Sequence, residues 1–179
     1  PLICLLDPHP RKPHFLAWVQ VTANEDYEVL RTCQVDGGAE AVRDAVREIE
    51  SELGHRHVLR LMDPNMGASP SGAQRELTWQ REFDNVGLNF DLADDSSVGR
   101  KRLNDFIKPD DRFYIPRFRI DPSCADAIFQ MKRFVWKDHK NMESKDISQE
   151  VLQKHDDYPA LFKYLMNYIP TGANSTPEV

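Results

Sequence analysis

The sequence predicts an α/β fold built on a mixed sheet, in which three antiparallel strands are followed by parallel strands and helices flank the sheet. Three successive segments rich in β-branched, aromatic and other apolar residues, at 2–6, 15–21 and 27–35, predict the antiparallel part. Apolar residues at helical spacing in 42–53, followed by a short apolar run at 58–62, predict a helical connection to a fourth strand. A connection of that length suits a parallel strand.

The first predicted strand is a continuous apolar run, as expected of a strand that is covered on both faces, and it ends on Asp7. The fourth predicted strand also ends on an aspartate, Asp63, which a proline follows. Gly54 stands where the intervening helix should stop. A later strand at 113–120 contains Pro116, which indicates an edge position in the sheet.

Further helices are expected after the fourth strand. A Gly/Ser/Pro loop at 65–72 comes first, and the expected helices are 72–84, 96–108 with polar capping residues at 94–97, 121–133, a polar segment at 142–154 and 158–168. We assign residues 1–169 to one domain, and the composition of 170–179 predicts a flexible C-terminal tail. Because the chain starts at Pro1, we expect an excised domain or a processed fragment.

Composition limits the classes of function. The formal net charge of −6 does not suggest a protein that coats nucleic acid by bulk attraction, although a local basic face can still bind phosphates. No run approaches the roughly 18 to 20 apolar residues of a membrane span, and no signal peptide precedes the first strand, so we expect a soluble intracellular protein. The three cysteines are too scattered for a zinc knuckle and are expected to be small buried residues.

Acidic residues mark three predicted strand or helix ends. If the first and fourth strands lie side by side, their ends bring Asp7 and Asp63 within reach of one ion, and a late helix packed there adds Asp156 or Asp157. Carboxylate ligands select Mg²⁺ or Mn²⁺, and two ions about 3.5 to 4 Å apart would suit phosphoryl transfer. Each aspartate alone is more often a turn or cap residue. Their joint placement favours the metal site.

Three short segments carry a family resemblance: Leu5-Leu6-Asp7-Pro8, Arg60-Leu61-Met62-Asp63-Pro64, and His155-Asp156-Asp157-Tyr158-Pro159-Ala160-Leu161 with Tyr164-Leu165. With the order of elements, they resemble the nuclease domain of the large terminase subunit of tailed bacteriophages, which has a ribonuclease H-like fold. The resemblance implies that Asp7, Asp63 and Asp157 are catalytic metal ligands and that Asp156 is close enough to contribute. Many relatives have another aspartate where this chain has Pro159.

The resemblance also implies an activity and a setting. The chain would be a metal-dependent endonuclease, with Mg²⁺ or Mn²⁺ and two ions, that cuts concatemeric viral DNA during genome packaging in the host cell cytoplasm. Its partners would be double-stranded DNA, an N-terminal packaging ATPase in the full-length protein, the portal and the small terminase subunit. We expect the isolated domain to be monomeric. No segment has the Gly-Lys-Ser/Thr ending of a phosphate-binding loop, so ATP hydrolysis is not expected.

Other charged residues receive roles only if the nuclease interpretation holds. His155 adjoins the acidic pair and is a candidate for orienting a metal ligand or transferring a proton, whereas His55 and His57 are interpreted as a solvated strand start. A nuclease with net negative charge must hold phosphates with local cations. The candidates are Arg11, Lys12, Arg100, Lys101, Arg102, Lys132 and Arg133.

Two alternatives remain open from the sequence. One is another ribonuclease H-like enzyme, a Holliday junction resolvase or a transposase-type nuclease, which would use the same carboxylates on a different DNA shape. The other is a non-catalytic module that docks onto DNA or a portal protein, with the aspartates serving as turns and caps.

Overall fold

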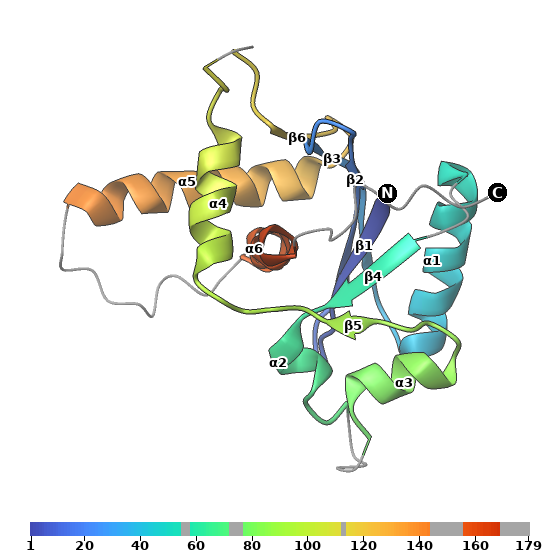
Figure 1. The fold of residues 1–179 in the computed structure, drawn as a ribbon. Coiled ribbons are helices and arrows are strands. Elements are labelled where there is room, and N and C mark those ends of the chain that lie inside the picture. Colours follow the sequence, from blue (N-terminus) through green and yellow to red (C-terminus); the bar gives the residue numbers. More distant parts are fainter. Residues whose placement is uncertain (55–57, 72–76, 112–113, 144–155, 169–179) are drawn as a thin grey trace.

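A six-stranded mixed sheet forms the centre of the molecule, with strand order β5-β4-β1-β2-β3-β6 (Figure 1). The computed structural model describes residues 1–54, 58–71, 77–111, 114–143 and 156–168. The elements are β1 (Leu2–Asp7), β2 (His14–Val21), β3 (Tyr27–Val35), α1 (Ala39–Leu53), β4 (Val58–Met62), α2 (Pro64–Gly67), α3 (Trp79–Asn85), β5 (Asp91–Leu92), α4 (Val98–Ile107), β6 (Phe118–Ile120), α5 (Ala125–Glu143) and α6 (Asp157–Asn167).

Strand pairing follows the sequence prediction. β1 pairs antiparallel with β2, and β2 pairs antiparallel with β3. β4 lies parallel to β1 on its other side, with Leu6 opposite Met62, so the carboxyl ends of these two strands meet at one edge of the sheet. β5 and β6 extend the sheet at its two ends, each parallel to its neighbour.

Alternating side chains of the strands divide the core into two layers. Ile3 and Leu5 of β1 pack into the layer that contains α6 residues such as Leu161, whereas Leu2 and Leu6 pack with α1 residues such as Val42. Figure 1 shows the same division: α4, α5 and α6 lie on one side of the sheet and α1 and α3 on the other. Both faces are covered, which explains why β1 has no polar residue before Asp7.

Several predicted boundaries were wrong, for local reasons. Of the helix expected at 72–84, residues 72–76 lie outside the described residues, and α3 begins at Trp79 because Thr78 caps it and also forms a bridge to Pro70. In the described part of the strand expected at 113–120, residues 114–120, only Phe118–Ile120 form a strand, and its edge position is confirmed. α5 begins at Ala125, since Asp121 forms a turn that accepts the Ser123 amide.

Other departures concern short or extended elements. α2 occupies part of the expected loop at 65–72, the two-residue strand β5 was not predicted, and α5 extends to Glu143 instead of ending near 133. Gly54 ends α1 as predicted, with a positive φ of 68°. Most of the expected helix at 142–154 and the tail at 170–179 lie outside the described residues. No helix in the described part of the chain has the length and apolar character needed to cross a membrane.

Candidate metal centre

The sheet directs two aspartates toward α6. Asp7 follows Leu5 by two positions, and Asp63 follows Leu61 by two positions, so the strand alternation that places both leucines against α6 places both aspartates on the same side. Asp7 and Asp63 are 6% and 7% exposed. Burial of two carboxylates at one sheet edge is unfavourable unless charged or polar partners compensate it, so their partners indicate what the site does.

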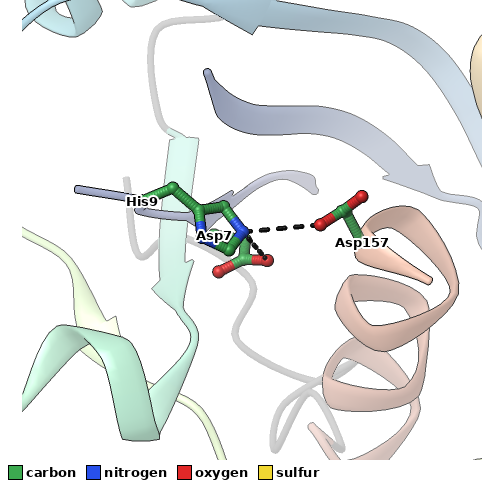
Figure 2. A group of neighbouring side chains, drawn as sticks. All are labelled: Asp7, His9 and Asp157. Carbon is green, nitrogen blue, oxygen red and sulfur yellow. Dashed lines mark ion pairs between the residues drawn. The ribbon is translucent and has the colours of Figure 1, made fainter. Parts of the chain in front are cut away.

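Asp7, His9 and Asp157 converge at this edge (Figure 2). The Nε2 atom of His9 lies 3.2 Å from Asp7 Oδ2 and 3.4 Å from Asp157 Oδ1. Lys12 Nζ approaches the same Asp157 oxygen at 4.0 Å. One imidazole nitrogen thus bridges a carboxylate at the end of β1 and a carboxylate at the start of α6.

The start of α6 is held in place by a buried amide. Gln130 of α5 is 6% exposed, and its Oε1 accepts a 2.9 Å hydrogen bond from the backbone N–H of Tyr158. This bond satisfies one of the amide donors that a helix leaves free in its first turn. Asp156 is the N-cap residue and Asp157 the first helical residue. Of the adjacent pair, the structure brings Asp157 to Asp7 and His9.

A second buried side chain fixes the loop that carries His9. His14, which is 1% exposed, accepts the backbone N–H of His9 at its Nδ1 atom at 3.1 Å. The other ring nitrogen, Nε2, lies 2.9 Å from the carbonyl of Gly37 and must donate to it, so the ring is neutral with its proton on Nε2. Trp79 and Phe83 pack edge-on against the same ring.

Burial and neighbouring charges act differently on the three side chains of the cluster. Burial raises the pKa of Asp7, the contact with His9 offsets this only in part, and the charges of Asp63 and Asp157 raise it further. Burial acts in the same direction on Asp157, but there His9 and Lys12 prevail and its pKa lies below the usual value. The contacts with Asp157 and Asp7 raise the pKa of His9 to about 9.

Asp63 has a different set of partners. Its Oδ1 accepts the amides of Asn65 and Met66, both at 2.8 Å, and so caps α2. Its Oδ2 accepts a 2.8 Å hydrogen bond from the Tyr164 hydroxyl of α6. Asp63 therefore lies at the predicted edge and adds its charge to the field at Asp7, but it is not part of the cluster formed by Asp7, His9 and Asp157.

The side chains of the cluster, and a buried oxygen of Asp7 that has no hydrogen-bond partner, fit a divalent cation. Two carboxylates and an imidazole offer ligand atoms that all lie within 4.8 Å of one another. The Asp7 Oδ1 atom is buried and has no hydrogen-bond partner, which is costly for an ionised carboxylate. A bound cation would supply the missing partner. Such a ligand set can hold Mg²⁺ or Mn²⁺.

The predicted basic residues fall into separate groups. Arg11 and Lys12 are exposed on the loop that carries His9, next to the acidic cluster. Arg102 lies at the far end of α6, where it donates to the Met166 carbonyl and covers the Phe106 ring. Arg100 and Arg133 lie over phenylalanine rings of α5, and Lys101 and Lys132 are exposed. Among these described basic side chains, Lys12 is the one with an ion pair to the cluster. His55, His57 and His155 lie outside the described residues.

Two residues of the site were missed from the sequence. His9 stands between two prolines after the first predicted strand, and Tyr164 lies in the helix expected at 158–168; neither was predicted as a site residue. The spacing of His9, two residues beyond the strand-end aspartate, was the available signal for His9. For Tyr164 the available signal was weaker, because a tyrosine in a buried helix face usually has a partner for its hydroxyl but the sequence does not say which.

Comparison with solved structures identifies the fold. The nuclease domain of the P22 large terminase superposes with a TM-score of 0.63 at 12% identity, covering 93% of this chain and 79% of that domain. The large terminase of a thermophilic bacteriophage superposes with TM-scores of 0.61 and 0.60 in two crystal forms, at 7% and 10% identity. The chain has the fold of a large-terminase nuclease domain.

This fold confirms the ribonuclease H-like mixed sheet expected from the sequence. The chain covers 38% to 39% of the length of the terminase from the thermophilic bacteriophage, so it corresponds to less than half of that protein. No protein-family model and no curated protein sequence matches the chain. At these low identities the likeness concerns the fold, and the function must be argued from the site.

Proposed function

We propose that the chain is a metal-dependent DNA endonuclease that acts in viral genome packaging. The observation that carries the proposal is the convergence of Asp7 and Asp157 at the end of β1, on a fold shared with the P22 terminase nuclease domain. The buried Asp7 Oδ1 atom without a partner supports a cation at this place. We propose Mg²⁺ or Mn²⁺ as the ion, with two ions in the complex with DNA.

The chain's own residues would divide the work as follows. Asp7 and Asp157 would hold the ion, and Asp63 would join them once its bond to Tyr164 is released. A bound ion would supply activation of the attacking water and neutralise charge on the leaving 3′ oxygen. Lys12, with a side chain 55% exposed beside Asp157, is placed to attract a backbone phosphate. Phosphate contacts carry no base specificity, so little sequence preference is expected.

The packaging role is drawn from the fold. Since the similar structures are large terminases, we propose double-stranded DNA as substrate and, in a full-length protein, a packaging ATPase, the portal and the small terminase subunit as partners. The setting would be the host cell cytoplasm, and the isolated domain would be monomeric. A junction resolvase would share the carboxylates, so cleavage of linear duplex and of four-way junctions should be compared.

A plasmid-nicking assay tests the activity. The 179-residue chain is expected to nick supercoiled plasmid with Mn²⁺ and not with excess chelator. Asp7→Asn should abolish nicking with the fold retained by circular dichroism. Asp84→Asn is the matched control, because Asp84 is an exposed aspartate of α3 on the opposite side of the sheet, and it should cut like wild type. Metal-independent cutting, or undiminished cutting by Asp7→Asn, would reject this centre.

A further inference from the structure

The imidazole of His9 occupies a position that the carboxylates of the centre alone do not explain. Its Nε2 atom faces both Asp7 Oδ2 and Asp157 Oδ1, at 3.2 and 3.4 Å (Figure 2). Two ligands at a right angle around an ion with bonds of roughly 2.1 Å are about 3 Å apart. His9 Nε2 is therefore spaced from each carboxylate oxygen nearly as neighbouring ligands of one ion are, and the ligand atoms of the three residues all lie within 4.8 Å of one another.

Contacts with His14 and Phe15 hold His9 in position. His14 accepts the backbone N–H of His9 and is itself fixed by the Gly37 carbonyl. Phe15 contacts the His9 ring edge-on, with ring centroids 6.0 Å apart. The β1–β2 loop is thus anchored at the residue that points into the site, which is what a metal ligand requires for precise placement.

An independent observation indicates that a cation belongs here. Asp7 is more than nine-tenths buried, its Oδ1 atom has no hydrogen-bond partner, and the same carboxylate contacts His9 through Oδ2. A single imidazole cannot satisfy both oxygens of Asp7 and one oxygen of Asp157 at once. An ion among the three side chains would.

We propose that His9 Nε2 is a metal ligand, so that the centre binds its ion through one nitrogen and two carboxylates and favours Mn²⁺ over Mg²⁺. Imidazole suits transition ions, whereas Mg²⁺ demands oxygen ligands and keeps its waters. This inference rests on the proposed metal centre and deepens it, because it assigns a nitrogen ligand beside the carboxylates and an order of ion preference.

Pulsed electron paramagnetic resonance with one equivalent of Mn²⁺ tests the ligand directly. The wild-type chain should show ¹⁴N modulation from a coordinated imidazole, and labelling histidine with ¹⁵N should replace it with the ¹⁵N pattern. His9→Gln should remove the modulation. In calorimetric titrations, His9→Gln should weaken Mn²⁺ binding roughly tenfold or more and Mg²⁺ binding by less than about threefold.

His9→Asp provides the converse test, because it converts the centre to carboxylate ligands only. Mg²⁺ affinity should then rise relative to Mn²⁺ affinity. His9 is not a ligand if Mn²⁺ binding is abolished by Asp7→Asn but the wild-type chain shows no ¹⁴N modulation, or if the modulation persists in His9→Gln. In either case the proposed centre stands without His9. If neither wild type nor Asp7→Asn binds Mn²⁺, both the ligand assignment and the proposed centre are overturned.

Discussion

The Tyr164 hydroxyl donates a 2.8 Å hydrogen bond to Asp63 Oδ2, and both groups are buried. The bond joins α6 to the residue that follows β4. The carboxylate of Asp63, the predicted second metal ligand, is thus paired with a neutral hydroxyl group and not with a cation. Burial, followed by the bond to Asp63, raises the pKa of the Tyr164 hydroxyl, which therefore stays protonated and remains a donor.

Tyr164→Phe is expected to separate stability from metal affinity. Loss of the bond to a charged acceptor should reduce the free energy of unfolding by about 1.5 to 3 kcal/mol. Freed from the hydroxyl, Asp63 Oδ2 should bind metal more readily, so Mn²⁺ affinity should increase. Urea unfolding and calorimetry measure the two effects. Tyr158→Phe is the matched control, because it removes a hydrogen bond from the same helix to the Cys33 carbonyl; its stability should fall and its Mn²⁺ affinity should not change. Equal Mn²⁺ affinities in wild type, Tyr164→Phe and Tyr158→Phe would count against a role for Asp63 in metal binding.

Substitutions of Asp63 distinguish its capping role from its charge. Asparagine keeps an oxygen for the Asn65 and Met66 amides, whereas alanine does not. Asp63→Asn should therefore keep the cap and lose nicking, while Asp63→Ala loses the cap as well, so its free energy of unfolding should lie about 1 kcal/mol below that of Asp63→Asn. Unfolding curves and the plasmid assay on both variants check this. If Asp63→Asn nicks at the wild-type rate, Asp63 is a helix cap only.

The pKa of His9 provides a test that requires no metal. In chelator, NMR titration of the imidazole should give a value of about 9, and Asp157→Asn should lower it toward 6.5. Because the folded pKa is raised, the contribution of His9 to stability is present below pH 6.5 and is lost as the pH rises through about 9. Urea unfolding at these two pH values should show that loss in wild type and not in His9→Gln. A wild-type pKa near 6.5 would contradict the observed contacts.

Gly99 tests how closely α4 packs on α6. A Cβ atom at this position would lie 2.2 Å from the Lys163 carbonyl oxygen, on the helix that carries Asp157. Gly99→Ala should therefore lower the free energy of unfolding by about 1 to 3 kcal/mol and weaken Mn²⁺ binding by displacing α6. Gly38→Ala, where no atom lies within 4 Å, is the control and should cost less than about 1 kcal/mol. Equal stabilities would show that α6 tolerates the displacement.

The sheet was predictable because its determinants are local. The apolar runs of β1 and β4 reflect burial on both faces, and the helix between them ends at a glycine with positive φ. The period of two also fixes the side of the sheet on which Asp7 and Asp63 lie. β5 could not be predicted, since it has two residues and exists only by pairing with β4. The start of α5 was misplaced because a turn at Asp121 satisfies the Ser123 amide that a helix start would have used.

The composition of the site was only partly predictable. The strand ends indicated Asp7 and Asp63. Which of their carboxylate oxygens are free of protein hydrogen bonds, and so able to bind a metal, depends on contacts made by residues distant in sequence. Tyr164 is 101 positions from the aspartate it contacts, and Gln130 is 28 positions from the amide that donates to it. Likewise, the start of α6 at Asp157 determines which of the two adjacent aspartates lies beside His9, and the sequence left this open.

A cation is expected to bind between Asp7 and Asp157. Crystals of the chain soaked in Mn²⁺ test it most directly, through anomalous difference density collected with and without chelator. A peak within coordination distance of Asp7 and Asp157 that is absent in Asp7→Asn crystals is the predicted result. Wild-type crystals saturated with Mn²⁺ that show no peak there, or a peak that survives in Asp7→Asn, would contradict it.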